Sequence, residues 1–439
     1  MPKGSAAGAE PTAAGLVDLY LDLHRNPELS GSERRTASRF ASWLSGAGYA
    51  VTTGVGGHGV VGILQNGPGP VVMLRTELDA LPVKEKTGLA YASAATAQGS
   101  DGRPYPVMHA CGHDAHIASV AGAATALAKR VDRWRGTVMV VGQPAEETLD
   151  GAAAMLADGL YSRWAKPDVV LAQHVAPLPA GLVAHAPGPV TAASASLEVR
   201  IHGRGGNPGL PHPPVNPIQV AASIVLALAE ASEKPADAFE MKGAAGFLGS
   251  PLSQVLTTVA TLHAGSAGNV IPELATVGVS LRAFDDAILR DGLSQVELIC
   301  RSASDAANCP RPPDLRLVSH SPANINDLEA GTLVRAAHVN AFGVTRVADI
   351  QPSMATEDFA LFGAPGVHLY NGDPVPTVYW MIGSVSPKKW AAAPGKTAAD
   401  KLAGLPPTHS PAFAPDPVPT LQTGTAAMVA AALAFLVAK

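Results

Sequence analysis

The order of hydrophobic and polar residues changes along the chain and outlines its architecture. Helical periodicity covers residues 13–23 and 33–47. Short valine-rich runs, typical of β-strands, then occur at residues 71–76, 137–142 and 168–173, separated by helical stretches. Strand–helix alternation is typical of α/β proteins, and continuously apolar strands suit a sheet that is covered on both faces. The pattern therefore predicts an α/β domain.

Polar residues of types that can bind a metal or take part in catalysis follow each of these valine-rich runs. Asp79 comes after the first run, Glu146 and Glu147 come after the second, and His174 comes after the third. In open α/β sheets, ligands bind outside the carboxyl ends of the strands. We therefore expect these side chains to converge on one site.

A second pattern begins at about residue 191. Residues 195–206 alternate like a half-exposed strand, an amphipathic helix follows at 214–232, and further strand-like stretches lie at 253–265 and 275–284. A second helix is expected before Pro310. This indicates a small α+β domain at 192–318, inserted into an α/β domain that consists of residues 1–191 and 319–439.

Two stretches near the C-terminus bear on the surface and the core. Residues 387–410 are rich in Pro, Ala, Gly and Lys, which predicts a surface loop before His409. The apolar stretch 426–438 is alanine-rich and too short to span a bilayer, so we expect a buried helix there.

Composition narrows the class of protein. The 439 residues carry a formal net charge of -5 and only 15% are charged, which excludes the basic footprint of a nucleic-acid binder and favours a small-molecule substrate. We expect no membrane association, because neither a secretory signal nor a transit peptide is visible. The three cysteines are too few and of the wrong parity for a disulfide framework, which favours the cytoplasm.

The segment HACGHDAH at 109–116 has three interpretations. Cys111 is a buried free cysteine among histidines, a nucleophile activated by His113, or a metal ligand. Thiolate and neutral imidazole are good ligands for zinc-class ions, and residues two apart on an extended segment face one side. The segment alone supplies too few ligands, so a metal site also needs carboxylates from elsewhere.

Glu146 and Glu147 are the candidates for those carboxylates. Adjacent side chains on an extended link diverge, so that one carboxylate can bind metal while the other faces a water molecule. The alternative is a solvated helix start, where acidic side chains complement the helix dipole. The position directly after a buried strand favours the metal site, and the same reasoning applies to His174. His409 lies among loop residues, and by itself it indicates little.

Taken together, these motifs resemble the M20 metallopeptidases, specifically the aminoacylase-like branch with hippurate hydrolases and plant auxin-conjugate amidohydrolases. The resemblance covers nearly the whole chain. It rests on DLHRNPELSGSE, LRTELDALPV, MHACGHDAH, QPAEET, QHVAPLPAG, GRGG at 203, NVIP at 269, TEDFALF at 356 and the terminal HSPAF. It implies a catalytic α/β domain with a mixed sheet, as in zinc exopeptidases, and an inserted α+β lid that also dimerises.

The resemblance also implies a reaction and a set of site residues. It implies hydrolysis of N-acyl amino acids with two divalent metal ions, such as Zn, Mn, Co or Ni. Glu146 matches the general base, and Asp79 matches an aspartate that orients a ligand. Cys111 is the expected thiolate bridge between the ions. The implied metal ligands are Cys111, His113, Glu147, His174 and His409.

The inserted domain carries the implied substrate contacts, which are Asn207, Asn269 and Arg282. An arginine can hold a substrate carboxylate with two hydrogen bonds. The family usually has a histidine where this chain has Asn207, and an asparagine can donate a hydrogen bond to an oxyanion but cannot donate a proton. His212, a few residues later, is a candidate to compensate. Glu77 stands where the family commonly has aspartate, which keeps the charge.

Three functions remain open on this basis. The first is an amidohydrolase that acts on N-acyl amino acids, and the second is a metallo-dipeptidase or carboxypeptidase on the same scaffold. The third, prompted by Asn207, is a weakly active relative that binds metal and ligand.

Overall fold

A computed structural model describes residues 13–99, 102–209, 215–233 and 255–438. The chain divides into two compact units. The large unit comprises residues 1–190, 325–351 and 358–439, and the inserted unit comprises residues 191–324 and 352–357. The short segment 352–357 joins the inserted unit from a distant part of the sequence, which the pattern did not indicate.

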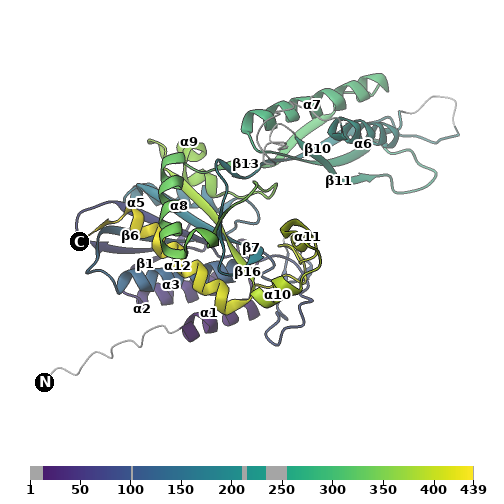
Figure 1. Ribbon diagram of the computed structural model, residues 1–439. Helices are drawn as coiled ribbons and strands as arrows, with labels where there is room; N and C mark the ends of the chain where they lie inside the picture. The colour runs from purple at the N-terminus through teal and green to yellow at the C-terminus, as the bar shows by residue number, and fades with distance from the viewer. Residues whose placement is uncertain (1–12, 100–101, 210–214, 234–254, 439) are drawn as a thin grey trace, which may run out of the picture. The chain divides into compact units, whose positions relative to one another are not determined.

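The large unit is built on a mixed sheet (Figure 1). Its strand order is β1-β2-β6-β3-β7-β16-β8-β15, and β17 pairs with β6. The central strands β6, β3, β7 and β16 are parallel, whereas β1, β2 and β17 add antiparallel edges. The α/β class with a mixed sheet is confirmed. The strands are β1 Ala50–Val55, β2 Gly59–Asn66, β3 Val71–Glu77, β6 Trp134–Gln143, β7 Val169–Pro179, β8 Val183–His185, β15 Val347–Asp349, β16 Thr377–Val385 and β17 Val437–Ala438.

Helices cover both faces of this sheet, which explains the continuously apolar strands. In β3, Val72 and Leu74 pack into one hydrophobic core and Met73 packs into the other. The first core includes α3, and the second includes the short helices α4 and α5. The helices of the large unit are α1 Ala13–Arg25, α2 Arg34–Gly46, α3 His113–Ala128, α4 Gly151–Ala157, α5 Leu160–Arg163, α8 Leu328–Phe342, α9 Val367–Tyr370, α10 Pro387–Ala392, α11 Ala398–Ala403 and α12 Pro417–Phe435.

The C-terminal helix is longer than the sequence indicated. α12 begins at Pro417, nine residues before the expected start at 426, and spans 19 residues. By length and composition it could cross a membrane, but half of its most apolar window is buried inside the protein. It packs against α3 and α8, and Met428 and Ala431 are fully buried. Residues 417–425, which precede the expected apolar stretch, therefore also belong to this core helix.

The expected loop at 387–410 is also more ordered than predicted. α10 is capped by the Ser386 hydroxyl, which accepts the N–H of Lys389. α11 begins with a capping box between Thr397 and Asp400. These caps satisfy backbone groups that otherwise have no partner at a helix start, and so they stabilise short helices in an alanine-rich stretch.

The inserted unit is an antiparallel four-stranded sheet, in the order β11-β12-β10-β13, with two helices on its hydrophobic core. In β12, buried and half-buried residues alternate along the strand, as expected for a sheet covered on one face. The strand β13 was not indicated by the sequence pattern. The elements of the inserted unit are β10 Ala193–His202, α6 Pro217–Glu233, β11 Leu256–Ala264, β12 Leu274–Ala283, α7 Asp286–Ala306 and β13 Asp314–Ser321.

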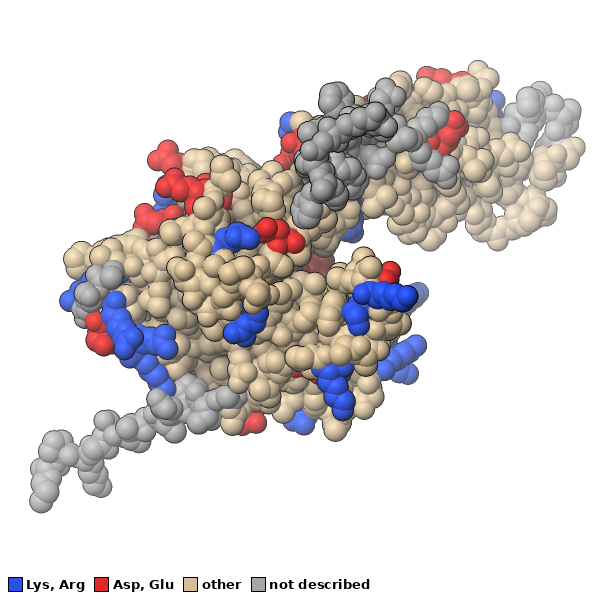
Figure 2. Space-filling model, viewed as in Figure 1, with Lys and Arg blue, Asp and Glu red and all other residues tan. Residues whose placement is uncertain are grey.

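On the face shown in Figure 2, the lysine and arginine side chains of the large unit stand among uncharged residues.

Candidate metal centre

Four separate segments of the large unit bring their polar side chains together. They form three overlapping groups, and within each group the potential ligand atoms all lie within 4.8 Å of one another. The shared members link the groups into one cluster, which contains every residue predicted as a metal ligand together with Glu146. The groups are Cys111, His113 and His174; Cys111, Glu147 and His409; and His113, Glu146 and Glu147.

Gly112 shapes the segment that carries Cys111 and His113. It has a φ of +85°, in the left-handed region that favours glycine. A Cβ atom at this position would lie 2.5 Å from the Cγ2 atom of Val175. Only glycine therefore allows the chain to turn into α3 so close to β7, with Cys111 just before the helix and His113 as its first residue.

Cys111 is buried, and its Sγ lies 3.3 Å from the Nε2 atom of His174. Burial raises the pKa of the Cys111 thiol well above its ordinary value, and the nearby carboxylates of Glu147 and Glu146 raise it further. A catalytic thiol needs the opposite, a lowered pKa. The surroundings therefore disfavour a thiol nucleophile and favour a residue that becomes a thiolate on a cation.

One ring nitrogen of His113 has a partner that orients the ring, and the other faces the carboxylates of the cluster. Its Nδ1 lies 2.9 Å from the carbonyl oxygen of Asp79, which fixes the ring. Its Nε2 is buried and has no hydrogen-bond partner in the described part of the chain, and it lies 3.8 Å from a carboxylate oxygen of Glu146 and 3.9 Å from one of Glu147. A buried polar atom without a partner requires an explanation, and a cation shared with these carboxylates provides one.

The protonation of His113 agrees with this interpretation. Burial lowers its pKa, but the carboxylates of Asp79, Glu77 and Glu147 outweigh burial and raise the pKa to about 10. Without a cation, the ring therefore carries the positive charge that balances its neighbours. A divalent ion can replace that proton, since metal binding to imidazole releases protons.

His174 and His409 contribute imidazoles with different exposure. The Nδ1 of His174 lies 2.7 Å from the carbonyl oxygen of Val175, which leaves Nε2 directed at Cys111. Burial lowers the pKa of His174 well below its ordinary value and keeps the ring in the neutral form that binds metals. His409 is more than half exposed, with its Nε2 3.5 Å from a carboxylate oxygen of Glu147. The cluster is therefore open to solvent beside His409.

Asp79 connects two of the predicted ligands. Its Oδ2 accepts hydrogen bonds from the Ser30 hydroxyl at 2.7 Å and from the backbone N–H of Glu147 at 2.9 Å. Its Oδ1 lies 3.4 Å from the Nδ1 of His113. Burial raises the pKa of Asp79, but the His113 ring outweighs burial and lowers it, so the carboxylate stays charged. Asp79 therefore holds His113 and Glu147 in place without itself facing the open side.

Comparison with known proteins identifies the family. The model of peptidase family M20/M25/M40 matches residues 73–393, which is well over half of the chain. The chain belongs to this family. The resemblance seen in the sequence motifs is confirmed, and so is the assignment to M20-type hydrolases.

Curated relatives in the M20/M25/M40 family cover most of this chain. The hippurate hydrolase of Campylobacter jejuni is 32% identical over 77% of this chain and 82% of its own length. The N-acetyl-L-cysteine deacetylase of Bacillus subtilis is 32% identical over 79% of this chain and 77% of its own length. Both names describe hydrolysis of an amide bond.

Solved structures share the fold over nearly the whole chain. A putative aminohydrolase from methicillin-resistant Staphylococcus aureus has a TM-score of 0.77 and 26% identity, and covers 96% of this chain and 97% of its own. A dinuclear metal binding peptidase of family M20 from Bacillus subtilis has a TM-score of 0.72 and 22% identity, with 96% and 98% covered. At that identity, the second likeness shows the fold alone.

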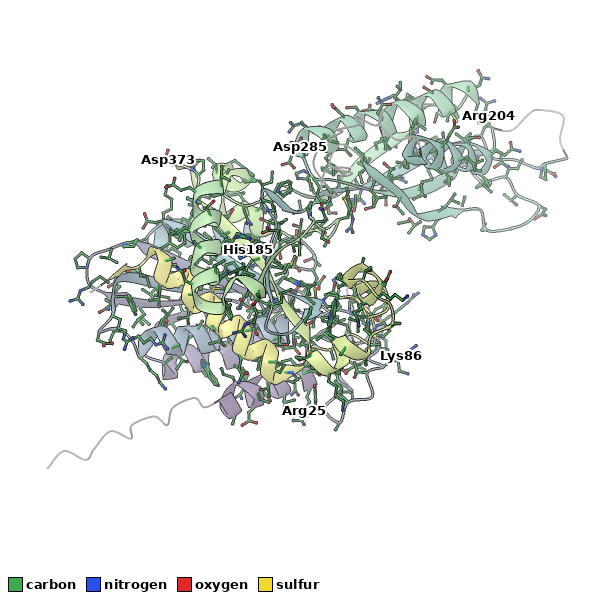
Figure 3. All side chains as sticks on the ribbon, in the orientation of Figure 1. Arg25, Lys86, His185, Arg204, Asp285 and Asp373 are labelled. Atoms are coloured by element: carbon green, nitrogen blue, oxygen red, sulfur yellow. The ribbon has the colours of Figure 1, made fainter. Side chains whose placement is uncertain are left out.

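The substrate contacts predicted for this M20 chain lie in the inserted unit and are less buried than the metal cluster. Asn207 and Asn269 are exposed. Their segments pair through Gly206 and Ile271, which exchange backbone hydrogen bonds of 3.2 and 2.9 Å. Arg204, three residues before Asn207, is labelled in Figure 3 and lies in this part of the inserted unit. The predicted compensating residue His212 lies outside the described residues.

Arg282 is half-buried on β12. Its Nη1 donates a hydrogen bond of 2.5 Å to the carbonyl oxygen of Met354, within the same unit. This bond anchors the side chain to segment 352–357. Because a guanidinium has five N–H donors, one such bond leaves others for a ligand.

Sequence reasoning noted Glu77 but did not predict the buried charged network beside the cluster to which it belongs. Arg75, Glu77 and Asp358 are almost completely buried, and His116 is fully buried. One sequence feature could have indicated this network. Arg75 and Glu77 stand in an apolar run typical of a buried strand, and such residues are almost never fully buried unless they are paired with opposite charges.

Proposed function

We propose that this M20/M25/M40 chain is a metal-dependent amidohydrolase that cleaves N-acyl amino acids into a carboxylic acid and a free amino acid. One observation carries the proposal, namely the gathering of Cys111, four further predicted ligands and Glu146 into one cluster. The names of the hippurate hydrolase and the deacetylase support this substrate class.

The donor set suits two divalent cations such as Zn, Mn, Co or Ni. One thiolate, imidazoles and a carboxylate are the ligands that such ions prefer, and the buried Nε2 of His113 has no hydrogen-bond partner among the described residues. Cys111, His113, Glu147, His174 and His409 would hold the ions, and Cys111 belongs to two of the groups described above. When bound, such a pair lowers the pKa of a water molecule and polarises the amide carbonyl.

Glu146 performs the proton transfers. Glu146 is buried and lies beside the predicted ligands His113 and Glu147. In this proposal it does not bind the metal ions. Its carboxylate accepts a proton from the attacking water, whose oxygen bonds to the carbonyl carbon. It then delivers that proton to the amide nitrogen as the C–N bond breaks. Asp79 keeps His113 in place throughout, through the contacts described above.

The inserted unit supplies the substrate contacts in this proposal. Arg282 holds the carboxylate of the amino acid. Asn207 and Asn269 lie beyond the opposite end of β12, and in this proposal they donate hydrogen bonds to the substrate bound by the partner subunit, with Asn207 at the developing oxyanion. The active form is a homodimer through the inserted unit. A cytoplasmic location agrees with three cysteines that are all free.

Release of free amino acid from a substrate panel tests the proposal. The panel contains N-acyl amino acids and dipeptides, and the enzyme is either metal-stripped or reloaded with Zn²⁺, Mn²⁺, Co²⁺ or Ni²⁺. We expect metal-dependent release from N-acyl amino acids. Faster release from dipeptides would instead identify a metallo-dipeptidase or carboxypeptidase. Hydrolysis that is insensitive to chelator would overturn the metal mechanism.

A further inference from the structure

A buried hydrogen-bonded chain runs beside the metal cluster, and the proposed reaction does not use it. It connects Arg75 and Glu77 at the end of β3 with His116 in the first turn of α3. Arg75 pairs with Glu77 in a close contact, and Glu77 lies 2.9 Å from the Nδ1 of His116. These three side chains are almost fully buried.

The contacts of His116 fix its tautomer. The backbone N–H of Val175 donates to the Nε2 of His116 at 2.8 Å. Nε2 is therefore the acceptor of the ring, and the proton is on Nδ1, which donates to the carboxylate of Glu77. Both ring nitrogens are used, so His116 is not a metal ligand although it lies close to several.

Val175 directly follows the predicted ligand His174, and both polar groups of its main chain are hydrogen-bonded. Its N–H donates to the Nε2 of His116, and its carbonyl oxygen accepts from the Nδ1 of His174 at 2.7 Å. The rings of His116 and His174 lie edge to face, with centroids 4.4 Å apart. A shift of His116 would therefore move the backbone of Val175, whose carbonyl oxygen sets the direction of the His174 ring.

Glu77 is itself anchored on its far side. Arg75 donates to the side-chain oxygen of Gln143 at 2.8 Å and to Asp358 at 3.2 Å. Asp358 also accepts from the Gln143 amide and from the backbone N–H of Ala152. This charged network ties β3 to β6 and to the start of α4, so Glu77 has a fixed position from which to hold His116.

We propose that His116 is a positioning residue for the metal centre. It transmits the fixed position of Glu77 to the backbone of Val175, whose carbonyl oxygen thereby directs the Nε2 of His174 toward Cys111. This inference rests on the metal site of the proposed function. Partners that orient a metal-binding histidine typically change metal affinity about 10- to 100-fold when they are removed.

Two substitutions separate the two hydrogen bonds of His116. In His116→Gln, the longer side chain places its carbonyl oxygen near the Nε2 position, and so it keeps an acceptor for the N–H of Val175. In His116→Asn, the shorter side chain keeps a donor for Glu77 near the Nδ1 position but loses the bond to Val175. The proposal requires the Val175 bond to matter more for His174.

The test is a Co²⁺ titration of the metal-stripped full chain by calorimetry, with the thiolate-to-Co²⁺ absorption band of Cys111 as a second readout. We expect His116→Asn to weaken Co²⁺ binding about 10- to 100-fold and to reduce the band, whereas His116→Gln stays close to the unmodified chain. Circular dichroism and thermal unfolding establish that each variant is folded. If His116→Asn does not fold, a folded His116→Gln that binds Co²⁺ as weakly as a His174→Ala variant would refute the role of the Val175 bond.

Unchanged Co²⁺ affinity in folded His116→Asn would overturn the positioning role and leave the proposed function intact. Conversely, an unmodified chain that binds Co²⁺ but hydrolyses no amide overturns the proposed function alone. An unmodified chain that binds no Co²⁺ overturns both.

Discussion

The two units of the chain hold their predicted functional residues in different ways. In the large unit, residues from four segments converge, and most of their side chains are buried and oriented by neighbours. In the inserted unit, Asn207 and Asn269 are exposed, and Arg282 is tied to one carbonyl oxygen. The side chains of the large unit thus orient one another, whereas those of the inserted unit are more exposed and have few partners among the described residues.

This difference follows from what each group must bind. A cation requires several donors at fixed positions, and only a rigid sheet with buried supporting charges provides them. A substrate contact needs to form only when the ligand is present. Substitutions in the large unit should therefore have larger effects than substitutions in the inserted unit, and the following predictions test that order.

The largest effect is expected for Glu146→Gln. The glutamine keeps the shape of the side chain but cannot take up a proton, so we expect kcat to fall about 10²- to 10⁴-fold. The metal content should stay unchanged, because Glu146 is not a ligand in the proposal. Steady-state kinetics and metal analysis by mass spectrometry measure the two quantities.

Glu147→Gln is the matched control for that variant. The same change one residue later removes a predicted ligand, so both kcat and the bound metal should decrease. If Glu146→Gln lost metal while Glu147→Gln retained it, the assignment of base and ligand would be reversed.

The second prediction concerns a buried ion pair of the large unit. His24 is fully buried, 2.7 Å from Asp114 and 3.2 Å from Glu85. Burial lowers its pKa, but hydrogen bonds to these two carboxylates outweigh burial and raise the pKa from 6.5 to about 9. A raised pKa stabilises the fold fully below pH 6.5, and this stability is lost as the pH rises through about 9.

The expected contribution is about 3 kcal/mol, and His24→Gln should remove it. Urea denaturation at pH 6 and pH 10 measures the effect, with the pH-dependent difference between the two proteins as the readout. Other groups titrate in both proteins, so this difference isolates His24. Equal pH dependence in both proteins would show that His24 is not charged in the folded state.

Sequence reasoning identified side chains that converge in the structure, because these residues follow recognisable strand-like runs or stand in specific motifs. Asp79, Glu147 and His174 follow valine-rich runs, and the parallel strands β3, β6 and β7 bring their segments together. The run before His174 indicated too short a strand, because β7 continues to Pro179 and His174 lies in its middle. The pattern of apolar residues likewise indicated the α/β class. Such features are local, and therefore visible in one sequence.

Features that depend on contacts between distant residues were not visible. The bond between His116 and Val175 joins positions 59 residues apart, and Arg75 and Asp358 are 283 apart. Nothing local marks segment 352–357 as part of the inserted unit. The start of α12 at Pro417 was also missed, because the residues before 426 are less apolar although they are packed in the core.

The smallest effect is expected in the inserted unit, for Asn207→His. The Oδ1 of Asn207 accepts the backbone N–H of Gly209 at 2.9 Å, which leaves its amide as a neutral donor. A protonated imidazole donates a stronger, charge-assisted hydrogen bond to an oxyanion, so we expect kcat to rise on the order of tenfold.

Asn308→His, at another exposed asparagine of the same unit, is the control and should leave kcat unchanged. Because Asn207 is exposed, stability and metal content should also stay constant. A kcat that does not rise in Asn207→His would mean that Asn207 does not contact the oxyanion, and the inserted unit would then contribute substrate binding without stabilising the transition state.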